Sequence, residues 1–334
     1  MATGVRPLSA FQLGKETVAG TAVATTRELY PSLGSGFDTG TVVAHHEGAQ
    51  RGTFANVTHG TVLQYAPVIA FSTEDSHGAT FDDLIYIGSQ LDSGQTGSGT
   101  TADKTWAFSS DQTAHTFETF TANVYDGQQA YEIEYCFATG ASITMGDATG
   151  LTQFSLDLVG RQVSKVSLDS VAANNAVKID NAGWTIKYAT AQSGLTGASA
   201  LANTLRSFTL TLDFPQRPHF YGDGNLFFGQ GLSSMNLGGT LSMVWDATDD
   251  AEVQWDRYQS QSTSFFRLRN TGPSLGGSAY QASFDVAVLW EDVNPGSGEI
   301  DGVMTTDMTG KIVYDATWGD ALQLDLINSL ASIP

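Results

Sequence analysis

The sequence contains a single cysteine, and this shortage excludes two kinds of stabilising site. Cys136 is the only cysteine among 334 residues, so the chain can form neither an internal disulfide nor a metal site with four thiolates. Cys136 alternates with Tyr135 and Phe137 in a strand-like pattern, which predicts a buried and unreactive thiol. We expect no metal and no cofactor.

Long apolar runs are missing as well. The opening stretch MATGVRPLSAFQLGKE lacks the apolar run, about 7–15 residues long, that a signal peptide needs. No window approaches the roughly 18 apolar residues of a membrane-spanning helix. We therefore expect a protein that is made in a cytoplasm, is not exported through a signal peptide and does not enter a membrane.

Positive charge is scarce. The chain has 15 Lys and Arg against 35 Asp and Glu, a formal net charge of −20, and the acids are spread over both halves. A protein that binds nucleic acid needs a basic stripe to neutralise phosphates, and none is visible. The acidic excess indicates either plain solubility or the repulsion of another polyanion.

Catalytic motifs are also absent from the sequence. It has no phosphate-binding P-loop and no H-E-x-x-H zinc motif. Glu132 and Glu134 are two residues apart, so they share a strand face as paired glycosidase carboxylates could. Acids with this spacing lie far more often on a solvated sheet face, and we expect no enzyme.

Alternation of apolar and polar residues dominates what is present, and it predicts a mainly β protein. The predicted strands are 61–73, 105–110, 116–127, 129–140, 152–160, 183–190, 206–215, 238–248, 264–270, 280–292, 310–317 and 321–328. Most of the 36 glycines lie between these runs, where turns require positive φ.

Two segments have helical rather than alternating periodicity. Residues 77–91 place Phe81, Leu84 and Ile85 on one face, and residues 246–261 begin with an acidic cap region. Residues 89–104 are rich in Gly, Ser and Thr and predict a mobile loop after the first of these helices.

The order of elements suggests an internal duplication. Residues 138–160 and 308–328 share the triplets Asp-Ala-Thr and Leu-Asp-Leu at an offset of 168, and a strand and a short acidic helix precede both. The alternative is that two adjacent β domains look alike because alternation is common to all strands. We read the chain as a tandem duplication of one β unit of about 150 residues.

The segment LGKETVAGTAVATTRELYP, residues 13–31, resembles the N-terminus of the tail tube proteins, or major tail proteins, of long flexible-tailed bacteriophages. Further on, Phe117, Val124, Gly127, Tyr131-Glu132 and Cys136 fit the same family pattern. Some members are doubled, which suits the duplication. The resemblance implies two tandem β-sandwich or β-barrel units, each flanked by a short α-helix.

It also implies a structural subunit that polymerises into stacked rings around a channel for the viral genome. A trimer of doubled chains is favoured over a hexamer. If each unit supplies about four strands, ~24 strands at ~4.8 Å and ~40° tilt give a wall ~48 Å across and a lumen of ~38 Å. Other expected partners are the tape measure, tail terminator and distal tail proteins, and the expected location is the tail of the virion.

Candidate site residues follow from the resemblance. The N-terminal segment, Gly14–Tyr30, is either an arm that lies along a neighbouring subunit or an edge strand of its own sandwich. The candidates for subunit or ring contacts are Gly14, Glu16, Gly20, Thr21, Ala22, Thr25, Gly94 and Gly97. Glu132 and Glu134 are the candidates for lumen-facing acids, which would let DNA slide without specific binding.

The expected division of the chain is an arm with linker strands over 1–50, a first unit over 51–170 and a second over 171–334. A competing reading is an adhesin or carbohydrate-binding β-sandwich. Its stacking platforms would be Trp184, Trp245, Trp255 and Trp318, although tryptophans are more often core residues. Rings or filaments of the purified protein would favour the tube.

Overall fold

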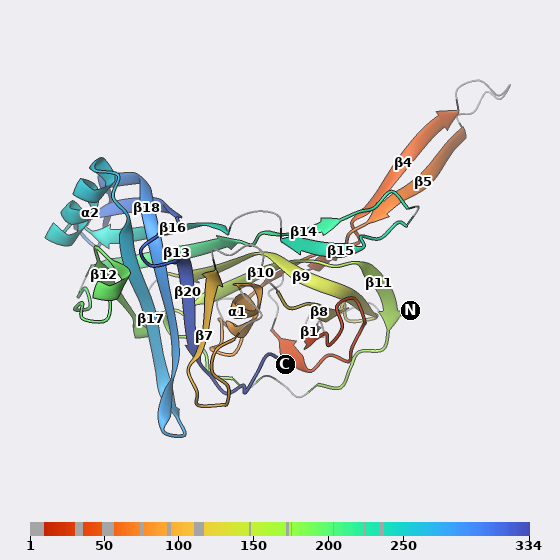
Figure 1. Ribbon diagram of the computed structural model, residues 1–334, viewed down its shortest axis with the longest axis horizontal. Coiled ribbons are helices and arrows are strands. Elements are labelled where there is room, and N and C mark those ends of the chain that lie inside the picture. Colours follow the sequence, from red (N-terminus) through yellow and green to blue (C-terminus); the bar gives the residue numbers. More distant parts are fainter. Residues whose placement is uncertain are drawn as a thin grey trace.

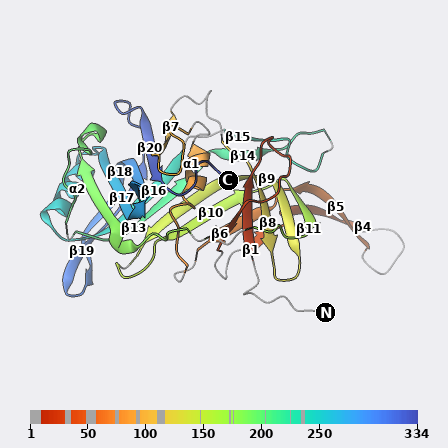
Figure 2. The ribbon, with the colours of Figure 1, turned by 90° about the horizontal axis from the view of Figure 1, so that it is seen from below.

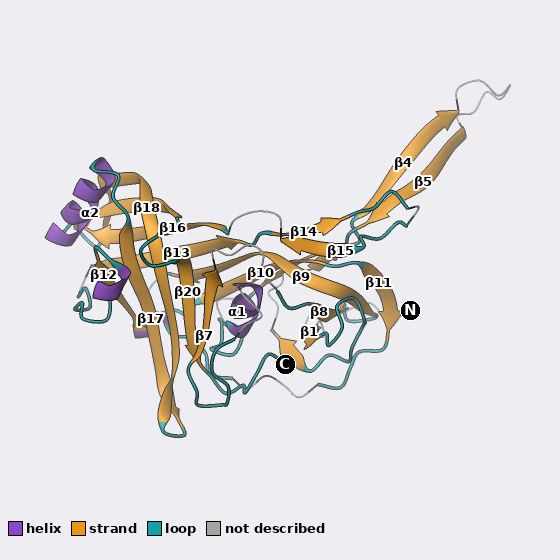
Figure 3. Ribbon diagram, in the orientation of Figure 1, coloured by secondary structure: helices purple, strands orange, loops and turns teal. Residues whose placement is uncertain are grey.

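Antiparallel strands form most of the molecule, and the mainly β class is confirmed (Figure 3). The computed structural model describes residues 10–30, 36–48, 57–73, 77–91, 95–109, 117–146, 148–171, 174, 176–202, 204–223, 225–233 and 237–334. The alternation in the sequence becomes an alternation in burial: β16, Gly238–Asp246, buries every second side chain.

The elements fall into two runs along the chain. The first comprises β1 (Ala10–Lys15), β2 (Arg27–Leu29), β3 (Gly36–Asp38), β4 (Thr41–Gly48), β5 (Val57–Tyr65), β6 (Val68–Ser72), α1 (Ile85–Leu91), β7 (Lys104–Ser109), β8 (Phe120–Tyr125), β9 (Ala130–Met145), β10 (Gln153–Val159) and β11 (Gln162–Val166). The second comprises β12 (Trp184–Ala189), β13 (Leu205–Asp213), β14 (Gln216–His219), β15 (Gln230–Ser233), β16, α2 (Asp249–Gln259), β17 (Ser264–Leu275), β18 (Ser278–Ile300), β19 (Val303–Ile312) and β20 (Asp320–Ile327).

Some predicted boundaries differ from the observed ones. The run 61–73 is divided between β5 and β6 at Ala66-Pro67, because proline has no N–H for the ladder. The predicted helix 77–91 is helical only over Ile85–Leu91. The predicted strand 310–317 includes just the end of β19, which begins seven residues earlier at Val303.

Two long strands organise the molecule. The first part of β9 pairs with β8 and β11, and its last part pairs with β10 and β13. In the same way β18 pairs first with β17 and β20 and then with β19. In Figure 1 the steep strands β17, β18, β20 and β7 cross the flatter strands β13, β16 and β10. Each long strand therefore belongs to two crossing layers.

The layers enclose one large hydrophobic core that draws on both halves of the chain. Helix α1 lies inside it, with every residue from Ile85 to Leu91 buried. A β-carbon at Gly88 would lie 2.4 Å from the Trp106 ring, so the close packing of α1 against β7 requires glycine. Helix α2 lies at one end of the molecule and is mostly exposed (Figure 1).

Two hairpins form separate two-stranded sheets. The β4–β5 hairpin projects away from the rest of the molecule in both views (Figures 1 and 2). The shorter β14–β15 hairpin lies against the first half of the chain, where Gly231 N–H donates to the Tyr135 hydroxyl at 3.1 Å.

Candidate assembly interface

Eight strands form a continuous sheet in the order β18–β19–β16–β13–β9–β10–β6–β3. The first four come from the second half of the chain and the last four from the first half. Apolar side chains of these strands face the core, whereas small polar ones lie on the opposite, open face. This sheet is where the two halves meet.

The junction between the halves is the antiparallel pairing of β13 with β9, from Phe208↔Met145 to Asp213↔Gly140. Leu210 lies opposite Ile143 on the core face, and both side chains are 1% exposed. On the open face the hydroxyls of Thr144 and Thr209 lie 3.3 Å apart. Backbone pairing and apolar burial therefore seal this edge.

Strand pairing repeats between the two halves. Seven strands of the first half have counterparts with the same neighbours in the second half, apart from the junction and the added strands β2 and β7. In chain order, the strands β1, β3, β6, β8, β9, β10 and β11 correspond to β12, β13, β16, β17, β18, β19 and β20. A helix follows β6 and β16 in each half, and a hairpin, β4–β5 or β14–β15, precedes them. Duplication in this sense is present in the strand order.

A pair of β-bulges fixes the alignment of the halves. The ladder of β9 with β10 skips Thr139, and that of β18 with β19 skips Glu291. The residue before each bulge, Ala138 or Trp290, lies opposite Leu158 or Gly310. Both the bulged residues and these partners are related by an offset of 152 (291 − 139 and 310 − 158). The offset of 168 inferred from the sequence is wrong, because it aligns β10 with β20, the counterpart of β11.

Both ends of the eight-stranded sheet are open edges among the described residues. Strand β3 pairs with β6 alone, and its Gly36 and Asp38 are exposed. Beyond Val288, β18 pairs only with β19, and residues 294–300 are exposed. By the alignment above, β3 corresponds to β13 and β18 corresponds to β9. The two open edges are therefore the counterparts of the edges that pair with each other inside the chain.

The open face of this sheet is polar and acidic. Its hydroxyls form cross-strand bonds, such as Ser142 with Ser155 at 2.7 Å. Lys311 and Arg206 are the cations of the eight described strands over this sheet; Lys311 bonds Glu291, and Arg206 bonds Asp246 at 2.6 Å. Further acids on this face are Asp38, Asp157, Asp213, Asp292 and Asp307. The face is therefore electronegative.

The N-terminal segment packs within its own chain. Strand β1 pairs with β8 over its whole length and with β2 over Phe11–Leu13, so it is flanked on both sides there instead of forming an edge. Glu16 is 4% exposed, and its carboxylate accepts hydrogen bonds from the N–H groups of Gly20 and Tyr135, both at 2.7 Å. The hydroxyls of Thr119 and Thr121 donate to it as well.

The other interface candidates fall into three groups. Gly14 and Thr25 are buried, and the Thr25 hydroxyl donates to Asp169 at 2.8 Å. Gly20 is half-buried with φ +77°, whereas Thr21 and Ala22 are exposed. Gly97 has φ +81° in the turn before β7, and Gly94 lies outside the described residues.

The predicted lumen acids lie on the part of β9 that pairs with β11, outside the eight-stranded sheet. Glu134 bonds Arg161 at 2.7 Å. Burial raises the pKa of Glu132, and the nearby charges of Asp169 and Glu134 raise it further. Their role as lumen acids stays a prediction.

Comparison with known proteins leaves the chain without an assigned family. No protein-family model matches it, and no curated protein is significantly similar to it. The described residues contain no group of three or more His, Cys, Asp or Glu side chains that could hold a metal ion. Neither described helix is long and apolar enough to span a membrane.

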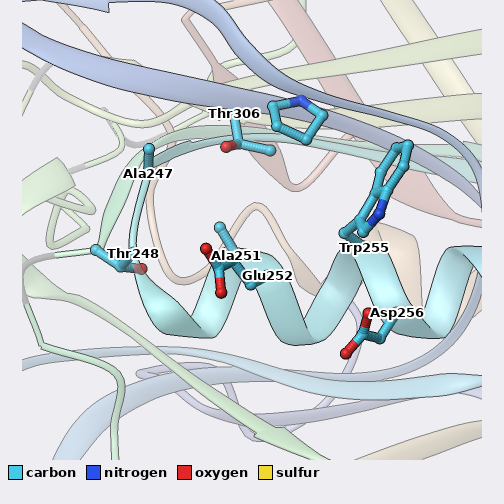
Figure 4. Close-up of a pocket in the computed structure, with 8 residues that line it drawn as sticks. Ala247, Thr248, Ala251, Glu252, Trp255, Asp256 and Thr306 are labelled. Carbon is cyan, nitrogen blue, oxygen red and sulfur yellow. The ribbon is translucent and has the colours of Figure 1, made fainter.

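A pocket of about 360 Å³ lies between α2 and the edge of the eight-stranded sheet. Figure 4 shows Ala251 and Trp255 projecting from α2 toward the strand that carries Thr306. Pro295 of β18 completes this wall. The pocket thus lies on the core side of the open β18 edge.

The tryptophans of the carbohydrate-binding alternative are mostly inaccessible. Trp184 and Trp245 are buried in the core. Trp255 and Trp318 are half-buried, and each lines a pocket.

The sequence did not single out β3 or the end of β18, because a three-residue strand is too short to show alternation and the segment after Trp290 is interrupted by Pro295 and Gly296.

Proposed function

We propose that this chain is a structural subunit of a tube, as its resemblance to phage tail tube proteins implies. Copies join head to tail, the β3 edge of one against the β18 edge of the next. The observation that carries the proposal is the β13–β9 junction, which already joins two equivalent units inside one chain and leaves the equivalent edges open at both ends. Closing a ring removes such edges, which otherwise promote aggregation.

The strand count favours a ring of three chains. One chain supplies eight consecutive strands, so three supply 24, and the wall is then ~48 Å across with a lumen of ~38 Å. A ring of six chains would be about twice as wide. The smaller lumen is wide enough for a DNA duplex and close enough to guide it.

The open face suits the wall of a channel for DNA. DNA carries a negative charge per ~1.7 Å of its axis, and basic walls would hold it by counterion release. The two cations that the described strands place on this face are paired with acids, and most of its other polar side chains are hydroxyls and further acids. The proposed role is passage of the genome without specific binding, within a virion tail that also contains tape measure, terminator and distal tail proteins.

Electron microscopy of the purified protein at high concentration tests this function. We expect rings or stacked tubes, with top views showing six similar lobes around a hole of about 40 Å. A protein that stays dispersed under all conditions, and that binds immobilised glycans, would instead support the carbohydrate-binding alternative through Trp255 or Trp318.

A further inference from the structure

The junction inside the chain defines how two copies would meet. In it, Thr209, Leu210 and Thr211 lie opposite Thr144, Ile143 and Ser142. The pairing of β3 with β6 and of β13 with β16 makes Gly36, Phe37 and Asp38 the counterparts of Thr209, Leu210 and Thr211. Adding 152 to Ile143 and Ser142 gives Pro295 and Asn294. The ladder of β18 with β19 has a second irregularity between Pro295 and Gly298, so the counterpart of Thr144 is Gly298, which lies opposite Thr305.

We propose that β3 of one copy pairs antiparallel with β18 of the next copy, in the register Phe37↔Pro295 and Asp38↔Asn294. This inference rests on the proposed function and specifies its contact. The occupant of the open β18 edge is thus a second copy of this chain, not an unrelated strand.

Side-chain chemistry supports this register on the core face. Phe37 lies opposite Ile69 in its own chain, so its ring faces the core side, where it is half-buried and contacts Tyr131. Pro295 lines the pocket beside Trp255 on the same side. In the paired state the Phe37 ring covers Pro295 at this pocket. At the β13–β9 junction, Leu210 covers Ile143, the counterpart of Pro295, in the same way.

Charges on the open face disfavour one of the two nearest registers that keep Phe37 on the core side. In the proposed register Asp38 faces Asn294, which is neutral. A slip of two residues toward the start of β18 would place Asp38 opposite Asp292, and like charges directly across an antiparallel pair are destabilising. A slip of one residue would turn Phe37 to the acidic face.

Pro295 limits the strength and the promiscuity of this edge. Proline has no N–H, so the Phe37↔Pro295 pair offers a single backbone hydrogen bond, from the Phe37 N–H to the Pro295 carbonyl. Proline in an edge strand also hinders unspecific strand addition. The contact between copies is therefore weaker than the β13–β9 junction, and assembly depends on the fitted side chains.

Cysteine cross-linking tests the register. Opposed residues of an antiparallel pair have Cα atoms about 4.5–5.5 Å apart, within the range of a disulfide. In D38C/N294C, oxidation of the assembled protein should link most chains into species up to a closed trimer on a non-reducing gel. The native Cys136 is fully buried, and burial raises its pKa, so it stays unreactive.

The matched control is G36C/D292C, whose cysteines lie four residues out of register and about 13 Å apart. A β-carbon at Gly36 meets no other atom within 4 Å, so this substitution fits. If tubes form and the control links as well as D38C/N294C, or D38C/N294C does not link, the register is wrong and the function stands. If no assembly forms, both are overturned.

Discussion

Single residues show most clearly what the N-terminal segment does. Glu16 was a candidate for contacts between subunits, yet its carboxylate organises the first half of its own chain. It joins the turn at Gly20 to β8 and β9 through four hydrogen bonds. Three of its four partners lie more than 100 residues away in the sequence, and no local pattern can reveal them.

We expect Glu16→Gln to lower the free energy of unfolding by about 1–3 kcal/mol, because the amide NH₂ must then face one of two backbone N–H donors and leave it unsatisfied. Urea denaturation followed by tryptophan fluorescence measures the change. Thr17→Ala is the control, since Thr17 is exposed and should change stability little. An unaltered midpoint for Glu16→Gln would mean that the carboxylate is not the organising group.

At the scale of elements, alternation found most of the long strands, but it missed the eight-residue β4 and the shortest strands. The runs at β10, β12 and β20 were predicted within about two residues, because each buries one face. Strands β2 and β3 have three residues each, and their existence depends on partners elsewhere in the sheet. The repeat was inferred partly from the triplet Leu-Asp-Leu, which lies on the non-equivalent strands β10 and β20. The pairing of the strands, and not the local sequence, defines the equivalence.

Leu210 and Phe37 occupy equivalent places at the closed and the open junction, so their truncation should have different effects. Leu210→Ala removes a fully buried side chain, and we expect a loss of about 2–5 kcal/mol in the free energy of unfolding. Phe37→Ala should destabilise the isolated chain less, since Phe37 is half-buried, but it should prevent tube formation.

Urea titration and electron microscopy of both variants give the two readouts. Leu210→Ala serves as the control for general loss of stability: if its remaining folded protein still assembles while Phe37→Ala does not, the effect of Phe37 is on the contact between copies. Normal tubes from Phe37→Ala would count against the β3 edge as an assembly surface.

At the scale of the whole molecule, the open face of the eight-stranded sheet carries part of the net charge of −20. Composition gives the size of the acidic excess but not where it lies, and the predicted lumen acids, Glu132 and Glu134, lie on strand pairs outside the eight-stranded sheet. The open face instead places Asp157 and Asp213 on either side of Gly140, in one row across β10, β9 and β13. Only the pairing of distant strands brings these two acids together.

Replacing these two acids with lysines should make the assembled tube retain DNA in its channel. Asp157→Lys with Asp213→Lys adds two cations per chain to the proposed channel, and tubes assembled with a short DNA duplex at low salt should then protect that DNA from nuclease. Each phosphate neutralised contributes about −0.9 to the slope of log affinity against log salt, so protection should vanish steeply as salt rises. Wild-type tubes should protect none.

The matched control reverses Asp249 and Asp250, which are exposed on α2, on the side of the sheet opposite the acidic face. This variant has the same net charge as the channel variant, so we expect it to bind DNA equally well at low salt, but the DNA should stay on the outside and be digested. Equal protection by the two variants would show that protection does not depend on where the lysines lie, and would contradict the proposal that the acidic face is the channel wall. Protection confined to the channel variant separates a conduit from a merely acidic surface.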